Sequence, residues 1–353
     1  MFSTMLLGKP NWKLMQETLR RLSGREDYDV LVGPKQGSDV SVLRLTQDRV
    51  MVSSTDPISF IPQLGAEDSA TLSVHGVASD VATSSMLPRY ALFDLNLPPS
   101  MPDSLLRKYW VSIHKACRDL GVAILGGHTG RFQGCNFSIV GGATMLAFGK
   151  SDRYVTSSMA RDGDDIIATK SAALEAAVVL ARCFPKMTTD RLGKNVQERC
   201  ASRLSQISTV ADAIVASSLG VRSNGVTAMH DVTEGGTLSA ASEVAKASRL
   251  SITIDADQIP IYDDVRQVCA LFKIDPLRSL GQGSLLISSR PGYAAKIMQR
   301  LRSRRIDSAI IGKLTRRAGH NVIVRDGRTR TLVRSEGDPY WRAYWSGIRK
   351  RLS

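Results

Sequence analysis

Segments with strand-like and helix-like hydrophobic patterns alternate along most of this chain. Leu106, Trp110, Ile113 and Cys117 repeat at helical spacing, and the apolar run Val122–Leu125 follows them. Further helical patterns cover 171–183, 210–219, 235–247 and 262–272, and strand-like runs cover 40–45, 50–54, 137–148, 166–169, 251–254, 283–288 and 321–324. This alternation predicts an α+β fold of mixed α/β layers. A solenoid is excluded because the chain has no short repeat, and a helical bundle because strand patterns run throughout.

The chain length of 353 residues corresponds to about two domains. Polar residues dominate 150–165, so we expect an N-terminal domain at 1–155 and a C-terminal domain at 156–353. Hydrophobic residues make up 43% and charged residues 23%, which are values of a globular protein. No apolar run approaches the ~20 residues of a membrane span, and the first apolar stretch is too short for a secretory signal. We therefore expect a cytoplasmic protein without a membrane partner.

Charge and cysteine content narrow the classes of partner. The net charge of +14 favours anionic partners such as nucleotides, phosphorylated metabolites or an acidic protein. The basic clusters Arg300–Arg305 and Arg349–Arg351 lack interleaved aromatic residues, so a solvated basic face is favoured over a nucleic-acid site. The five cysteines form no CxxC pair, which favours free thiols over disulfides or a zinc site.

Three aspartates in the first half stand in short polar segments that we expect at the ends of strands. They are Asp39 in Gly-Ser-Asp, Asp56 in Ser-Thr-Asp, and Asp80 in Ser-Asp-Val-Ala. Mg²⁺ bound to a nucleotide takes one or two carboxylates and completes its shell with phosphate and water. Each aspartate alone is equally what a cap or a turn would use. The three together in one half of the chain favour a metal–phosphate site only modestly over turn and cap residues.

Two glycine-containing segments could hold an anion or a polar substrate. Gly126-Gly127-His128-Thr129 follows an apolar run, and its glycines would let backbone N–H groups approach a phosphate closely. A simple glycine turn explains the same residues. The segment 229–236 (Met-His-Asp-Val-Thr-Glu-Gly-Gly) precedes a helical pattern, and a helix start suits an anion. An ordinary capped helix, with acidic residues in its first turn, is the alternative.

Read together, these motifs resemble those of the aminoimidazole-ribonucleotide synthetase (PurM-like) superfamily. That superfamily includes the hydrogenase-maturation factor HypE, selenophosphate synthetase and thiamine-monophosphate kinase. The resemblance runs through nearly the whole chain in the family's order: 37–43 (GDDAAVL-like), 54–56 ((S/T)TD), 79–92 (NDxA…GAxPxYxL), 126–129 (GGDT or GGHT) and 229–236 (MHDPTEGG). The last form is that of HypE-like proteins rather than of thiamine-phosphate kinases. Thr169-Lys170 with Glu175 is similar to a TKxxxxE stretch of archaeal synthase-related proteins.

The resemblance implies a two-domain PurM-like fold whose N-terminal α/β domain dimerises through its sheet and whose C-terminal domain is α+β. It implies Mg-dependent phosphoryl transfer from ATP to a small acceptor. By position, metal ligands would be Asp39, Asp56 and Asp80, and the catalytic set on the acceptor side would be His230, Asp231 and Glu234. The nucleotide would be bound by Lys35, Gly37, Asp56, Gly126, Gly127, His128, Thr129, Gly235 and Gly236.

This sequence departs from the family pattern at three places that bear on metal binding and on the acceptor. HypE proteins end in a cysteine that carries a carbamoyl group, whereas this chain ends at Ser353 and its last cysteine is Cys269. Ser38 stands where the family often has a second aspartate, and His128 where it often has one. A nucleotide-switched maturation or scaffold protein and a thiamine-monophosphate kinase remain alternatives to an ATP-dependent phosphotransferase. The spacing of Trp341, Tyr344 and Trp345 predicts that the last segment docks on the body as a short helix.

Overall fold

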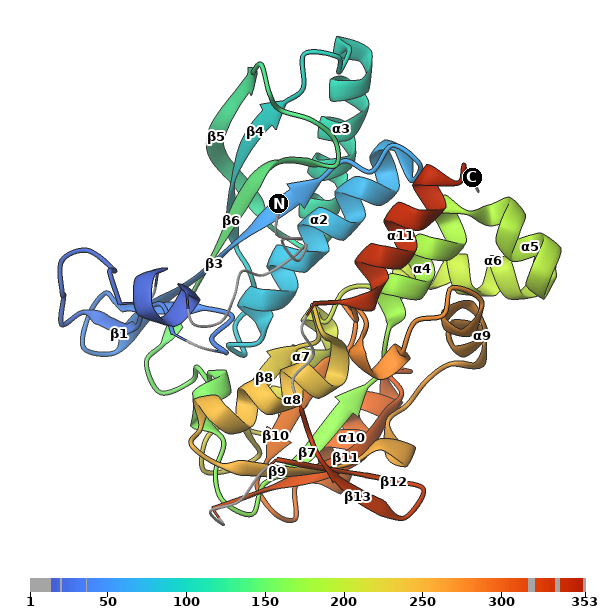
Figure 1. Ribbon diagram of the computed structural model, residues 1–353. Coiled ribbons are helices and arrows are strands. Elements are labelled where there is room, and N and C mark those ends of the chain that lie inside the picture. The colour runs from blue at the N-terminus through green and yellow to red at the C-terminus, as the bar shows by residue number, and fades with distance from the viewer. Residues whose placement is uncertain (1–13, 20, 36, 317–320, 334–336, 352–353) are drawn as a thin grey trace.

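The computed structural model describes residues 14–19, 21–35, 37–316, 321–333 and 337–351 (Figure 1). Each half of the chain builds one sheet, and a helical layer lies beside them. The π-helical turn at Met15–Leu19 and the 3₁₀ turns at Ser157–Met159, Arg203–Gln206, Ala256–Gln258 and Pro276–Arg278 connect the larger elements. The mixed architecture agrees with the predicted fold class.

The first half forms a six-stranded sheet. Its order is β1 (Val30–Val32), β2 (Ser41–Arg44), β3 (Arg49–Ser59), β6 (Ile139–Lys150), β4 (Tyr90–Leu97) and β5 (Ala123–Arg131), antiparallel except for the β4–β5 pair. Burial alternates along β4, as expected for a strand with one covered face. The apolar side chains of α2 (Gly65–Ala82) and α3 (Asp103–Asp119) share a core with the covered face.

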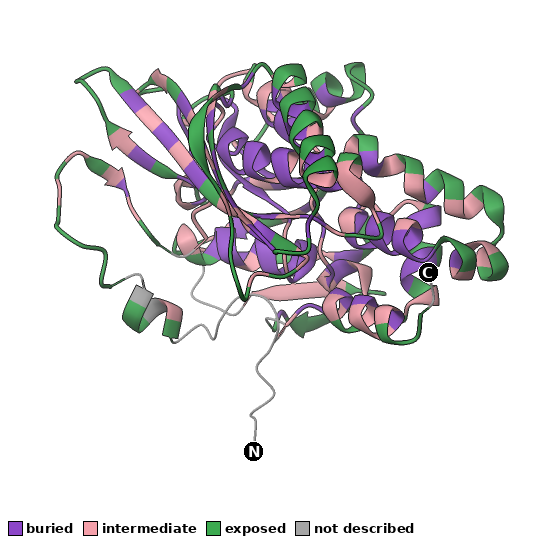
Figure 2. Cartoon of the chain, turned by 90° about the horizontal axis from the view of Figure 1, so that it is seen from above, coloured by how far each residue is buried: buried purple, intermediate pink, exposed green. Residues whose placement is uncertain are grey.

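The second half forms a seven-stranded sheet. Its order is β13 (Arg328–Thr331), β12 (Val322–Arg325), β9 (Ser251–Asp255), β11 (Ser308–Thr315), β7 (Asp165–Thr169), β10 (Leu285–Ser289) and β8 (Val226–Asp231). Its central strands are buried on both faces. Ile167 packs in a core with α7 (Val210–Ser217) and α10 (Ala294–Ser303), whereas Ile166 packs with α8 (Gly236–Ala247). Figure 2 shows the resulting concentration of buried residues where helices meet sheets.

A third core joins the remaining helices. It contains α4 (Leu174–Cys183), α5 (Pro185–Leu192), α6 (Lys194–Ser202), α9 (Asp263–Leu271) and α11 (Pro339–Arg349). Helix α11 lies beside α4 (Figure 1), and Tyr340 and Tyr344 are buried in this core together with Phe184. The predicted docking of the last segment as a helix is therefore confirmed for 339–349, while Ser353 lies outside the described residues.

The structure corrects three local expectations. Strand β3 continues to Ser59, so Asp56 lies within a strand, and Asp80 lies in the last turn of α2. Helix α2 has no single apolar stripe in the sequence because most of its Ala, Ser and Val residues are buried, around most of the helix. The segment 126–130 is an extended part of β5 rather than a turn, and β5 is largely exposed rather than buried.

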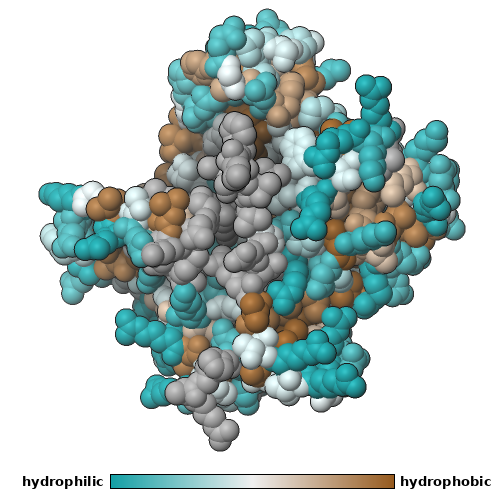
Figure 3. Space-filling view, viewed as in Figure 1, coloured by the Kyte–Doolittle hydropathy of each residue, from teal (hydrophilic) through white to brown (hydrophobic). Residues whose placement is uncertain are grey.

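The surface and the thiols agree with the sequence analysis. Hydrophilic side chains cover most of the face in Figure 3, with separate apolar patches. All five cysteines are free, and four of them are buried: Cys117, Cys183, Cys200 and Cys269. Among the described residues, no helix combines the length and the apolarity that a bilayer crossing requires.

Candidate functional site

Asp39, His230 and Asp231 come together where the two halves of the chain meet. Asp39 precedes β2, whereas His230 and Asp231 end β8. Asp39 Oδ2 lies 3.3 Å from His230 Nδ1, and one ligand atom from each of the three residues falls within 4.8 Å of the others. Gly37 fixes this approach: it has a φ of +66°, and a Cβ there would lie 3.0 Å from the carbonyl oxygen of Glu243 in α8.

His230 is a buried cation rather than a free base. Its Nδ1 lies 2.7 Å from the backbone carbonyl of Asp231, and its Nε2 lies 3.1 Å from Glu243 Oε2. Burial opposes protonation of the ring, but the Asp39 carboxylate and the hydrogen bonds to Asp231 and Glu243 outweigh it and raise the pKa well above its ordinary value. Both ring nitrogens are engaged with protein oxygens.

The pKa of Asp80 is raised by burial and by the neighbouring carboxylates. Its side chain is buried and accepts a 2.9 Å hydrogen bond from Ser54 Oγ. Burial, followed by repulsion from Asp231, Asp56 and Asp39, raises the pKa of Asp80 well above its usual range. The three aspartates predicted as metal ligands therefore share one electrostatic environment with Asp231.

This set of donors fits a hard divalent cation. Carboxylate oxygens are the protein ligands that Mg²⁺ takes, and several carboxylates close together repel one another until a cation or a proton neutralises them. In the absence of a cation, the raised pKa of His230 favours a positive charge on its ring, and the raised pKa of Asp80 favours its protonated form. Of the three predicted ligands, Asp39 belongs to the described group with ligand atoms within 4.8 Å, whereas Asp56 and Asp80 are coupled to it by charge; these three aspartates would hold the cation.

The start of α8 is occupied by side chains from the C-terminal segment. Gly235 adopts a φ of +80°, and its N–H donates to Asp338 Oδ2 at 2.8 Å. Glu234 Oε1 accepts a hydrogen bond from the indole N–H of Trp341 at 3.1 Å. The segment 229–236 is thus joined directly to α11, a contact that no pattern in the sequence indicated.

A second acidic group lies beside this loop. Burial, then the charges of Asp338, Glu234, Asp56 and Asp231, raise the pKa of Glu175 in α4 to about 8. Burial raises the pKa of Asp338 to about 6, against the hydrogen bonds from Gly235 and Tyr340. Both carboxyls hold protons more strongly than free carboxyls do, which extends the proton-holding character of the site from Asp80 to α4.

The predicted nucleotide contacts are distributed unevenly. Gly37, Asp56, Gly235 and Gly236 lie on the loops and strands of the junction, and Lys35 is exposed on the loop that leads to Gly37. Gly126, Gly127, His128 and Thr129 lie on the exposed edge strand β5. The register pairs Asp56 with Ala143, Ala143 with Phe93 and Phe93 with Gly127, so three strand spacings, about 14 Å, separate Asp56 from Gly127.

His128 faces away from the aspartate cluster. It pairs with Asp94, one position along from the row of Asp56, and successive residues of a strand point to opposite faces. Its ring stacks on Phe132 with centroids 6.1 Å apart. Within one chain, the segment 126–129 and the cluster are therefore not brought together.

Sequence reasoning missed Glu243 and Asp338 and gave Lys170 and Glu175 no role. Lys170 is buried, forms an ion pair with Asp212 at 3.1 Å and donates to the carbonyls of Gln206 and Ser208. Lys170 therefore connects the end of β7 to α7 and to the loop that precedes it. The Asp-Pro pair at 338–339 signals a helix cap, and Asp338 does cap α11, but its reach to Gly235 has no local signal.

Two family models match most of this chain. The N-terminal domain of AIR synthase related proteins matches residues 37–148, and the C-terminal domain matches residues 161–325. This chain belongs to the AIR synthase related family. The matched ranges contain the whole aspartate cluster and the β8–α8 loop of this family member.

Curated relatives of this AIR synthase related protein include several named enzymes. Carbamoyl dehydratase HypE of Escherichia coli is 26% identical over 76% of this chain and 76% of its own length. Selenide, water dikinase of Methanococcus maripaludis is 25% identical over 62% of this chain and 67% of its own. Thiamine-monophosphate kinase of Nitrosopumilus maritimus is 27% identical over 39% of this chain and 43% of its own.

Solved structures share the fold. E. coli HypE aligns with a TM-score of 0.70 at 23% identity, covering 82% of this chain and 87% of HypE. A chain of the HypE–HypF complex aligns with a TM-score of 0.70 at 18% identity, covering 91% of this chain and 99% of that chain. HypE in complex with ATP aligns with a TM-score of 0.63 at 21% identity, covering 96% of this chain and 99% of that chain. These alignments confirm the predicted two-domain PurM-like fold.

Proposed function

We propose that this protein binds ATP with a divalent cation at the aspartate cluster and transfers a phosphoryl group to a small acceptor. The observation that carries the proposal is the group formed by Asp39, His230 and Asp231, together with the charges of Asp231, Asp56 and Asp39 that act on the buried Asp80. Membership of a family whose relatives include a dikinase, a kinase and a HypE solved with ATP supports it. The boundaries 1–155 and 156–353 remain our proposed domains.

Each residue of the cluster has a role that follows from its contacts. Asp39, Asp56 and Asp80 hold the cation, which, when bound, neutralises charge on phosphate oxygens. His230 positions Asp39 and Asp231 and offsets part of their charge. It acts as a positioning residue because both ring nitrogens are engaged.

The acceptor side is proposed at the β8–α8 loop. Asp231 belongs to the cluster, and Glu234 follows it in the loop. The N–H groups of Gly235 and Gly236 are bonded to Asp338 and to the carbonyl of Thr233, so the carboxylates are the groups that face an acceptor. Glu234 is held by Trp341, so α11 bounds this side of the site. A carboxylate here is suited to accept a proton from an attacking hydroxyl.

The remaining parts of the proposal concern assembly and location. We propose a cytoplasmic homodimer formed through the six-stranded sheet, in which β5 of one chain brings its 126–129 segment toward a nucleotide. The surplus of basic residues suits an acidic protein partner.

A nucleotide-switched scaffold is the second candidate, because a HypE neighbour was solved with HypF and this chain carries +14 net charge. Single-turnover assays with γ-labelled Mg-ATP separate the candidates. Acceptor-dependent ADP formation supports the phosphotransferase. Tight ATP binding with no turnover across hydroxyl, carboxylate and selenide acceptors supports the scaffold, and turnover of thiamine monophosphate identifies a kinase of that class.

A further inference from the structure

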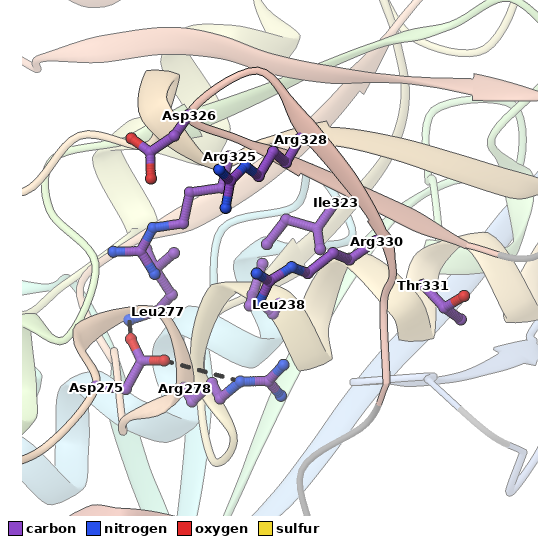
Figure 4. Close-up of a pocket in the computed structure, with 10 residues that line it drawn as sticks. All are labelled: Leu238, Asp275, Leu277, Arg278, Ile323, Arg325, Asp326, Arg328, Arg330 and Thr331. Carbon is purple, nitrogen blue, oxygen red and sulfur yellow. Dashed lines mark hydrogen bonds and ion pairs between the residues drawn. The ribbon is translucent and has the colours of Figure 1, made fainter.

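A pocket of about 610 Å³ lies between the β12–β13 hairpin, the start of α8 and the 276–278 turn (Figure 4). Four arginine side chains line it: Arg278, Arg325, Arg328 and Arg330. Leu238 and Ile323 add apolar walls. The volume lies within the range of small-molecule sites, about 300–1,000 Å³.

The hairpin register explains why three arginines share this pocket. Arg325 pairs with Arg328 and Ile323 pairs with Arg330 across the antiparallel β12–β13 ladder. Paired residues, and residues two apart along one strand, point to the same face. The Asp326-Gly327 turn, with φ values of +49° and +69°, fixes this register. One face of the hairpin therefore presents three guanidinium groups and one apolar side chain.

These charges are not balanced within the described part of the chain. Arg325, Arg328 and Arg330 form no ion pair within 4.0 Å with another described residue, whereas Asp275 Oδ2 lies 3.8 Å from Arg278 Nε. The Asp257 carboxylate at the hairpin turn accepts from the backbone N–H of Asp326 at 2.8 Å. Asp275 and Asp326 are the acidic residues of the lining, against four arginines. Like charges directly opposite each other on a ladder destabilise it, so the Arg325–Arg328 pair costs free energy unless an anion lies between the guanidiniums.

We propose that this pocket binds a small molecule carrying at least two negative oxyanion charges and an apolar body. Arginine matches phosphate and carboxylate through paired N–H groups, and several arginines around one concavity select a polyanion. Leu238 and Ile323 give the apolar part of the ligand a surface on which to pack. Phosphate esters and polycarboxylates share this chemistry.

The pocket is separate from the aspartate cluster but borders the same helix. None of the residues lining it belongs to the predicted metal, nucleotide or catalytic sets. A Cβ at Gly236 would lie 2.7 Å from the carbonyl oxygen of Leu277, a lining residue, so the pocket wall and the start of α8 are in direct contact. The proposal does not depend on ATP use.

Calorimetric titration of the full chain without divalent cations tests the proposal. The probes are pyrophosphate and citrate, which distinguish phosphate from carboxylate ligands, at fixed ionic strength. Arg328→Gln with Arg330→Gln should weaken binding of the preferred probe at least tenfold. Arg300→Gln with Arg304→Gln, exposed positions at the end of α10, removes equal charge and should leave affinity within twofold. Arg325→Gln alone, expected to weaken binding at least threefold, is the second variant if the hairpin pair lowers the melting temperature.

Three outcomes would overturn the proposal. Absence of binding by both probes at millimolar concentration is one. Equal loss in the hairpin and α10 variants is the second, because it would show unspecific attraction to a basic surface. Tighter, hairpin-dependent binding of a hexaglutamate peptide than of either probe is the third, because it would make this pocket a docking site for an acidic protein segment.

Discussion

At the scale of single residues, the site between the two halves of the chain combines the buried His230 with carboxyls whose pKa values are raised. His230 contacts Asp39, Asp231 and Glu243 through its two ring nitrogens. Asp80 and Glu175 have raised pKa values, both first through burial and then through neighbouring aspartates. A divalent cation arriving at this site therefore replaces a proton, and its binding should tighten as pH rises.

Asp56→Asn should remove most of the effect of Mg-ATP on stability. In the native protein, ATP at about 100 times its dissociation constant should add roughly 2–3 kcal/mol to the free energy of unfolding. The amide keeps the shape of Asp56 but removes a charged ligand from the cluster. Melting curves with and without Mg-ATP measure the difference, and Asp152→Asn, an exposed residue in the turn after β6, is the matched control. A native melting curve that Mg-ATP leaves unchanged would contradict the proposed site.

Glu175 predicts a stability loss at alkaline pH. Its folded pKa of about 8 lies above the unfolded 4.5, so the folded state binds the proton more tightly. The stabilising contribution is complete below pH 4.5 and is lost as pH rises through 8. Glu175→Gln mimics the protonated form and should be more stable than the native chain at pH 9, by up to about 5 kcal/mol, with a difference below about 1 kcal/mol near pH 5. Urea unfolding in EDTA measures this, with Glu198→Gln on the exposed face of α6 as control. A constant difference between pH 5 and 9 would refute it.

At the scale of elements, the sequence predicted those whose hydrophobic period is clear. Helix α3, with its regular apolar stripe, and the strands β2 and β7 agree with their predicted ranges. Helix α2 was not predicted because it is buried on most sides. Helix α10 and strand β11 were not predicted either, although both have amphipathic sequences. For the site, motif order grouped Asp39, Asp56, Asp80 and Asp231. Glu243 and Asp338 were missed because their contacts lie 13 and 103 residues away in the chain.

Asp338 should hold two helices at once. Its oxygens accept from Gly235 N–H at 2.8 Å and from Tyr340 N–H at 2.9 Å, so Asp338→Ala removes the cap of α11 and leaves a buried donor at the start of α8. We expect a loss of about 2–3 kcal/mol in the free energy of unfolding, since a cap contributes about 1 kcal/mol and an unsatisfied buried group about 1–3. Chemical unfolding measures it. Trp341→Phe, which removes the hydrogen bond to Glu234 and part of the ring packing on Tyr340, should cost less; an equal or greater cost would argue against the double role of Asp338.

The docked α11 also bears on HypE-type chemistry. Residues 339–353 contain no cysteine, and burial raises the pKa of the thiol of Cys269, which precedes them. A serine without an adjacent base is a poor nucleophile. Incubation with carbamoyl phosphate, ATP and a carbamoyltransferase should leave the C-terminal peptide unmodified by intact-mass analysis. A carbamoyl or cyano adduct mapped to 339–353 would overturn this expectation.

At the scale of the whole molecule, the two halves are joined by polar contacts rather than by a linker alone. Asp68 of α2 pairs with Arg182 of α4, and Thr209 N–H donates to Ser79 Oγ at 3.0 Å. The shared core of α2, α7 and β10 adds apolar contact between the halves. Such a junction holds the aspartates of α2 and β3 in a fixed relation to β8, which positioning of a phosphate requires.

The face of the six-stranded sheet opposite α2 and α3 predicts a homodimer. Leu92 of β4 and Leu125 of β5 are 38% and 57% exposed, and Ile139 and Phe148 of β6 are also exposed. A sheet face that the described helices leave open, with exposed apolar side chains, is a candidate for burial against a second copy, and a twofold axis would apply the same surface twice. Light scattering should therefore report twice the 38.4 kDa of one chain at micromolar concentration.

Leu92→Arg with Leu125→Arg should dissociate this dimer, because each substitution places a charge on the proposed apolar interface. Val111→Arg is the matched control: Val111 is 58% exposed on α3, which covers the other face of the sheet, so this variant should remain dimeric. A native chain that elutes as a monomer would refute the proposed assembly, and a dimer that survives both leucine substitutions would place the interface elsewhere. If the dimer forms as proposed, the 126–129 segment of β5 is at the interface, and the double variant should also bind Mg-ATP more weakly than the Val111 control does.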